Sequence, residues 1–171
     1  MPKSEPQTEH IYLVIAGGTI DNVCDDLDRN NQNSAIEAFV RESVKPYFEL
    51  STKVLFMKDS RDITEIDLRK LANEIEHCQY SHIVITHGTY TMARTAEFLA
   101  ENVQKFLDKT VIVTGAMIPL GDHGSDAAFN LGFAVHAALT TPTGVFIAMH
   151  GKLWNPGEVR KDCTVNRFTP E

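Results

Sequence analysis

Short apolar runs alternate with segments of helical periodicity five times along this 171-residue chain. The runs are rich in β-branched residues and are bounded by turn residues, which is typical of strands. Most of them show no alternation with polar residues, so we expect strands that are covered on both faces, as in a parallel sheet. The predicted strands are 11–16, 54–57, 82–86, 110–114 and 144–149.

Four segments between these runs carry apolar residues at the spacing of an amphipathic helix. These segments are 36–44, 68–75, 92–103 and 131–138. Cap residues or capping-box pairs are expected at three helix starts: Ser34 with Glu37, Thr64 with Asp67, and Ser125 or Asp126. The alternation predicts an α/β fold, a doubly wound, mainly parallel five-stranded sheet with helices on both faces, of Rossmann or flavodoxin type. After about residue 150 we expect a polar tail with no clear period.

Charge and composition exclude several functional classes. The net charge is −7 and Lys and Arg form no cluster, so no nucleic-acid partner is expected. The three cysteines, Cys24, Cys78 and Cys163, are far apart and argue against a disulfide framework and a structural zinc site. The amino terminus is polar, and no run approaches the roughly 18 apolar residues of a membrane span. We therefore expect a cytoplasmic protein with no metal and no membrane partner.

Three motifs rich in glycine and threonine follow predicted strands. They are AGGTI at 16–20, HGTYTM at 87–92 and GAMIP at 115–119. Ligands of open α/β sheets bind at the carboxyl ends of the strands, so these loops are candidates for a site. Each motif alone also fits a structural turn, a phosphate-binding loop or a helix cap, and the first lacks the third glycine of the dinucleotide signature. His87 is expected to be a structural hydrogen-bonding residue.

Taken together and in order, the motifs resemble the signatures of the bacterial-type L-asparaginase family, which read TGGTI, HGTDTM and GAMRP. The resemblance continues through SD at 125–126, NL at 130–131, GVFIAM at 144–149 and EVRK at 158–161. It implies hydrolysis of the side-chain amide of asparagine, sometimes glutamine, to a carboxylate and ammonia without a cofactor. A small-molecule amide substrate is thus the expected partner.

The resemblance also implies roles for individual residues. Thr19 matches the nucleophile, Thr89 the second catalytic threonine, and Lys161 the lysine that assists proton removal. A lysine acts as a base only when neutral, so its pKa must fall below about 10.4 through burial or neighbouring charge. Ser60 matches the residue that contacts the substrate α-carboxylate, and Ala116 matches the one whose carbonyl receives the amide nitrogen. The other predicted substrate-binding residues are Gly18, Asp59 and Gly88.

The chain departs from the family pattern in four ways. Tyr90, which we group with the catalytic residues, replaces the aspartate that pairs with the lysine and binds the substrate α-ammonium. Arg61 replaces the glutamine after the substrate-binding serine, and Cys24 stands where the flexible lid usually has a tyrosine. The usual carboxy-terminal domain has no counterpart, so residues 1–171 are expected to form a single catalytic domain.

Three of these departures each remove a contact to the α-ammonium of asparagine. A charge-assisted hydrogen bond contributes about 1.5–3 kcal/mol, so losing one or two predicts roughly 10- to 1,000-fold weaker binding. That weakening is avoided if Asp21, Asp59 or Asp62 supplies the missing carboxylate.

Two other functions fit the sequence. One is hydrolysis of a different small carboxamide that lacks an α-ammonium, with Arg61 binding a carboxylate. The other is a non-catalytic small-molecule binding domain, which the tyrosine at position 90 favours. Family members assemble, so a homo-oligomer is also expected.

Overall fold

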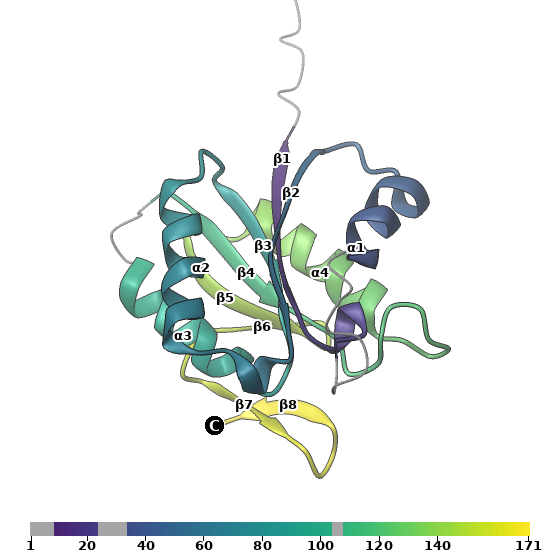
Figure 1. Cartoon of the computed structure of the whole chain (residues 1–171), viewed down its shortest axis with the longest axis vertical. Coiled ribbons are helices and arrows are strands. Elements are labelled where there is room, and N and C mark those ends of the chain that lie inside the picture. The colour runs from purple at the N-terminus through teal and green to yellow at the C-terminus, as the bar shows by residue number, and fades with distance from the viewer. Residues whose placement is uncertain (1–8, 24–33, 104–107) are drawn as a thin grey trace, which may run out of the picture.

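A computed structural model describes residues 9–23, 34–103 and 108–171 of the chain. Its main sheet has the strand order β2-β1-β3-β4-β5-β6, in which the first five strands are parallel and β6 is antiparallel (Figure 1). The strands are β1 (His10–Gly17), β2 (Glu49–Lys58), β3 (His82–Thr86), β4 (Thr110–Thr114), β5 (Gly144–Met149) and β6 (Lys152–Trp154). The order 2-1-3-4-5 is that of a flavodoxin-like doubly wound sheet, which confirms the predicted fold class. The predicted count of five strands is too low by one.

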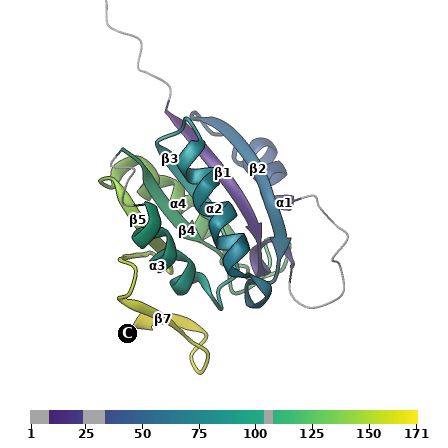
Figure 2. The same ribbon diagram turned by 60° about the vertical axis from the view of Figure 1, so that its left-hand side comes forward.

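Helices cover both faces of this sheet, as Figures 1 and 2 show. The helices are α1 (Ala35–Ala38), α2 (Glu65–His77), α3 (Met92–Val103) and α4 (Ala127–Thr140), with a π-helix at Phe39–Val44 and 3₁₀ turns at Thr19–Asp21 and Ser60–Asp62. Buried side chains of α2 and α3 join one core cluster, and those of α1 and α4 join another. The two clusters lie on opposite faces of the sheet.

Strand β1 shows why the parallel strands read as continuous apolar runs. Its residues alternate between the two clusters: Tyr12 and Val14 belong to one, and Leu13 and Ile15 belong to the other. Because successive side chains of a strand point to opposite faces, a strand covered on both sides needs apolar residues at every position.

The first helix differs from its prediction. Residues 36–44 were expected to form one amphipathic helix, but the α-helix ends at Ala38 and the chain continues as a π-helix. The Lys45 N–H donates to the carbonyl of Val40, five residues back. This wider turn changes which side chains face inward, so Val44 is 51% exposed instead of joining the apolar stripe.

Caps begin the first two helices at the predicted residues. Thr64 and Asp67 form the expected capping box of α2. Ser34 caps α1 by accepting from the backbone N–H of Ile36, while its own hydroxyl donates to the Asp21 carboxylate. The Asp21 contact ties the turn after β1 to the start of α1.

The predicted polar tail contains three strands, which the lack of a clear period in its sequence did not indicate. After β6, strands β7 (Val159–Asp162) and β8 (Arg167–Pro170) form an antiparallel hairpin near the carboxyl ends of the parallel strands (Figure 1). Trp154, Val159 and Phe168 are buried in the core cluster that contains α2 and α3. Strands of three or four residues bury too few side chains to produce a visible period. No helix among the described residues has the length and apolar character that a membrane crossing requires.

Candidate active site

The predicted site residues follow the carboxyl ends of four neighbouring strands. Thr19 follows β1, Ser60 follows β2, Thr89 follows β3 and Ala116 follows β4. Strands β1 and β3 are neighbours, and the connections after them run in opposite directions, from β1 to β2 and from β3 to β4. Such a topological switch point is where doubly wound sheets bind ligands.

Glycines let three of these loops touch. Gly18 has a φ of +85°, and a Cβ placed on it would lie 2.3 Å from the backbone of Gly88. A Cβ on Gly88 would lie 2.6 Å from the Oγ of Ser60. The loops that carry Thr19, Thr89 and Ser60 are therefore in direct contact, and larger residues at either glycine would separate them.

The fourth loop is held by Asn130, a residue that the sequence marked only as part of a motif. Its amide nitrogen donates to the Gly115 carbonyl at 3.0 Å and to the carboxylate of Asp126 at 2.8 Å. The Asp126 carboxylate in turn accepts from the N–H groups of Met117 and Ile118. Asp126 thus supports the loop rather than capping α4 through its side chain, and these contacts fix the buried Ala116.

At the start of α4, the hydroxyl of Ser125 accepts from the N–H of Ala127 at 3.1 Å. Of the two predicted caps, Ser125 is the one whose side chain bonds to the first turn of the helix.

Lys161 reaches the site from the hairpin β7–β8. Its Nζ donates to the Oγ1 of Thr89 at 2.8 Å, and Thr89 is only 2% exposed. Burial lowers the pKa of Lys161 below its ordinary value, with the Arg61 cation acting in the same direction and Asp59 and Cys163 opposing it. The amine is thus placed and partly desolvated as a lysine base requires. Thr19 is half-buried in the 3₁₀ turn after Gly18.

Two of the substituted positions, Tyr90 and Arg61, lie together beside Lys161. The Tyr90 ring centroid lies 3.7 Å from Lys161 Nζ and 5.1 Å from Arg61 Cζ. The Arg61 guanidinium donates to both oxygens of Asp59, at 3.0 and 2.9 Å, and this contact lowers the pKa of Asp59. The positive charge of Arg61 therefore lies against the Asp59 carboxylate of the same loop.

The three aspartates that could replace the missing carboxylate at position 90 differ in their surroundings. Asp21 accepts from the Ser34 hydroxyl and the Ala35 N–H, and its pKa is raised by burial. Asp59 pairs with Arg61, and Asp62 is exposed on the same turn. Position 24, expected to belong to the lid, lies outside the described residues.

His87 has the structural role that was expected. It is fully buried, and its ring nitrogens contact the Gly88 carbonyl at 2.7 Å and the Thr95 hydroxyl at 3.0 Å. Burial lowers the pKa of His87 to about 4, so the ring is neutral at pH 7. The described part of the chain contains no group of three His, Cys, Asp or Glu residues able to hold a metal ion.

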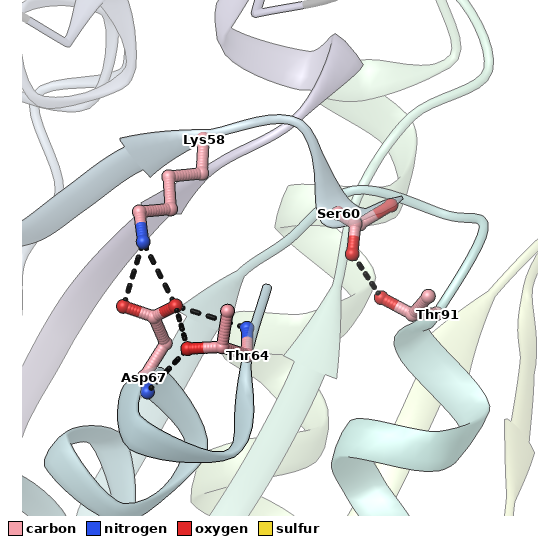
Figure 3. A network of polar contacts seen from close by, with 5 residues as sticks. All are labelled: Lys58, Ser60, Thr64, Asp67 and Thr91. Atoms are coloured by element: carbon pink, nitrogen blue, oxygen red, sulfur yellow. Dashed lines mark hydrogen bonds and ion pairs between the residues drawn. The ribbon is translucent and has the colours of Figure 1, made fainter. Parts of the chain in front are cut away.

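A polar network supports the loop that carries Ser60 (Figure 3). Lys58 donates to both carboxylate oxygens of Asp67 at 2.8 Å, and Thr64 closes the capping box on the same carboxylate. From the other side, the Thr91 hydroxyl donates to the Ser60 carbonyl at 2.7 Å. The two ends of the loop are thereby fixed to β2 and α2, and its middle is fixed to the loop before α3.

The substitution Asp67→Asn is expected to destabilise the fold by roughly 2 kcal/mol at pH 7. Burial alone would raise the pKa of Asp67, but hydrogen bonds from Lys58 and Thr64 outweigh burial and hold it at about 2. This pKa lies below the value of about 3.9 in the unfolded chain. The stabilisation by the Asp67 carboxylate is therefore complete above pH 3.9 and is lost as the pH falls through 2. Urea unfolding at pH 7 and between pH 4 and 2 measures it.

The control for that substitution is Asp62→Asn, which changes an exposed aspartate of the same loop and should alter stability by at most about 0.5 kcal/mol. An Asp67→Asn protein with the wild-type urea midpoint at pH 7 would show that the network does not stabilise the fold.

Comparison with known proteins agrees with this geometry. The family model described as "Asparaginase, N-terminal" matches residues 10–169. The chain belongs to the asparaginase family. It is 35% identical over 147 residues to L-asparaginase 1 of Escherichia coli strain K12, covering 80% of this chain and 42% of that protein. It is also 32% identical over 161 residues to a subunit of the glutamyl-tRNA(Gln) amidotransferase of Aeropyrum pernix, covering 86% and 36%.

Solved asparaginases share the fold. L-asparaginase I from Vibrio cholerae matches with a TM-score of 0.76 and 31% identity, over 95% of this chain and 51% of that one. The thermostable L-asparaginase from Thermococcus kodakarensis matches with a TM-score of 0.79 and 25% identity, over 94% and 51%. The chain thus spans between 36% and 51% of the length of these relatives. The family resemblance seen in the loop motifs is confirmed.

Proposed function

We propose that this asparaginase-family chain is an amidohydrolase that converts L-asparagine to L-aspartate and ammonia, with Thr19 as the nucleophile. The observation that carries the proposal is the hydrogen bond from Lys161 Nζ to Thr89 Oγ1, formed at the switch point of the sheet by an amine whose pKa burial lowers. A partly desolvated amine beside a buried hydroxyl is an arrangement that suits proton transfer.

The proposed reaction has two steps. The Thr19 oxygen attacks the side-chain carbonyl carbon of asparagine, the proton of its hydroxyl passes to the amide nitrogen, and the C–N bond breaks so that ammonia leaves. Water then attacks the Thr19 ester, which releases aspartate and restores the hydroxyl. Neutral Lys161 accepts a proton from the Thr89 hydroxyl and returns it, while the backbone around Ala116 receives the amide.

Asparagine is expected to bind weakly. Asp59 is paired with Arg61, and Asp21 is bonded to Ser34 and Ala35, so neither carboxylate is available to the α-ammonium without losing its partner. The exposed Asp62 is the remaining candidate, and solvent screens its charge. Losing one or two charge-assisted contacts weakens binding roughly 10- to 1,000-fold. A micromolar Michaelis constant for asparagine would contradict this part of the proposal.

A carboxamide without an α-ammonium is the second candidate substrate. Arg61 Cζ lies 5.1 Å from the Tyr90 ring centroid, and a guanidinium at this place suits a substrate carboxylate and disfavours an ammonium. Succinamate, which is asparagine without its amino group, tests this candidate directly. Faster hydrolysis of succinamate than of asparagine would establish it.

The substitution Arg61→Gln is expected to raise kcat/KM for asparagine about tenfold relative to succinamate, because it removes one cation and frees the Asp59 carboxylate for the α-ammonium. A coupled ammonia assay on both amides measures the ratio. Arg69→Gln, at an exposed arginine of α2, is the matched control and should leave the ratio unchanged. An unchanged ratio in Arg61→Gln would exclude this residue as a specificity determinant.

The same assay separates hydrolysis from the other candidate classes. Thermal stabilisation by an amide without ammonia release would indicate a binding domain. The relative from Aeropyrum pernix is named as part of an amidotransferase, so release of ammonia only with a partner protein would indicate that role instead. A cytoplasmic location and a homo-oligomer also belong to the proposal, and analytical ultracentrifugation tests the second.

A further inference from the structure

Tyr90 is an aromatic residue with an exposed side chain and two cationic neighbours. It is 53% exposed, so its ring is not held by a hydrophobic core. Lys161 Nζ lies 3.7 Å from the ring centroid and Arg61 Cζ lies 5.1 Å from it. Both distances are within the range of about 6 Å over which an aromatic face attracts a cation.

Lys161 forms no ion pair within the described ranges 9–23, 34–103 and 108–171. Its amine donates to the neutral hydroxyl of Thr89 and lies over the Tyr90 ring. Asp59 is the carboxylate whose charge acts on the amine, and it is bonded to Arg61. The amine is thus held without a carboxylate of its own.

We propose that Tyr90 is a positioning residue, whose aromatic face holds the Lys161 amine against the Thr89 hydroxyl in place of an acidic partner. The inference rests on the proposed amidohydrolase function. An aromatic face attracts an ammonium less strongly than a carboxylate does, and it neither takes nor gives a proton. The amine is therefore kept in place while losing its proton more easily than it would beside a carboxylate.

The other charges around Lys161 are consistent with this role. Burial lowers its pKa, Arg61 lowers it further, and Asp59 and the Cys163 thiol raise it. Asp59 and Arg61 come from the loop after β2, Cys163 comes from the hairpin turn, and the Tyr90 ring comes from the loop before α3. Of these groups, the ring is the one that contacts the amine without carrying a charge.

Three substitutions test the proposal on the full chain. Tyr90→Leu keeps an apolar side chain but removes the aromatic face, and it should lower kcat about tenfold with little change in KM. Tyr90→Phe keeps the face and should restore most of that loss. Tyr90→Asp supplies a carboxylate, and it should move the acidic limb of the kcat–pH profile upward by about one pH unit or more.

The direction of that shift follows from the required protonation state. Catalysis needs the neutral amine, so activity rises as the pH passes upward through the pKa of Lys161. A carboxylate neighbour stabilises the ammonium and raises this pKa, so the rise must move to higher pH. A purely structural role for Tyr90 would not move the profile. A Tyr90→Leu enzyme with wild-type kcat and pH profile would overturn the proposal.

A measurement without catalysis separates this inference from the proposed function. Reductive methylation with ¹³C-formaldehyde labels the lysines, and the Lys161 signal is assigned from its loss in Lys161→Met. Its NMR titration midpoint should rise in Tyr90→Asp, whereas the midpoint of the exposed Lys70 should not change. Unchanged midpoints would refute the role of Tyr90 even in an active enzyme. A raised midpoint in a protein that releases no ammonia would support that role and refute the function.

Discussion

Thr19→Ala protein is expected to release almost no ammonia from asparagine, with kcat reduced roughly 10⁴-fold or more. The substitution removes the oxygen that we propose as the one forming the covalent intermediate. Thr19 is half-buried in a 3₁₀ turn whose backbone is fixed by Gly18, so the fold should be retained. The coupled ammonia assay and circular dichroism measure activity and fold together.

Two variants make that experiment specific. Thr19→Ser retains a hydroxyl and should keep measurable activity, while Thr143→Ala, at an exposed position before β5, should behave as wild type. Full activity in Thr19→Ala would show that the nucleophile has been assigned to the wrong residue.

Lys161→Met is expected to lower kcat by roughly 10²- to 10⁴-fold, the range for removal of a general base. Methionine keeps an unbranched apolar chain on β7 but cannot accept a proton from Thr89. In steady-state kinetics across pH, the acidic limb of the kcat–pH profile, which reports the titration of the Lys161 amine, should also be lost. In wild type this limb lies below the ordinary lysine value, because burial lowers the pKa of Lys161.

Arg160→Met is the matched control, since Arg160 is an exposed cation on the same strand. It should retain wild-type kcat and an unchanged profile. Equal losses in the two variants would indicate that the hairpin was disturbed rather than that a base was removed.

The sequence identified the main sheet because its strands are buried on both faces. Strand β1 contributes alternate residues to two cores, and such a strand is recognisable as an uninterrupted apolar run. Strand β2 extends from Glu49 to Lys58, although only 54–57 was predicted, because this edge strand carries polar residues in its first half. The hairpin was missed because each of its strands has four residues and buries one apolar side chain, Val159 or Phe168.

The sequence predicted the part of the candidate site that is formed by residues directly after the parallel strands. Gly18, Ser60 and Gly88 each follow a strand, and carboxyl ends of parallel strands meet at one edge. The arrangement of Tyr90 over Lys161 joins residues 71 positions apart, and no local pattern encodes it. The pairing of Arg61 with Asp59 was readable in principle from their spacing of two in the turn, but the expected role of Arg61 concerned the substrate alone.

The hairpin that carries Lys161 has its own two-stranded sheet and is anchored to the rest of the molecule by the buried Val159 and Phe168. Thr89 and Thr19 lie instead on the loops that follow the central strands β3 and β1. Segments with few buried contacts open locally more readily than the core of a domain. We therefore expect the contact between Lys161 and Thr89 to be lost on warming before the central sheet unfolds.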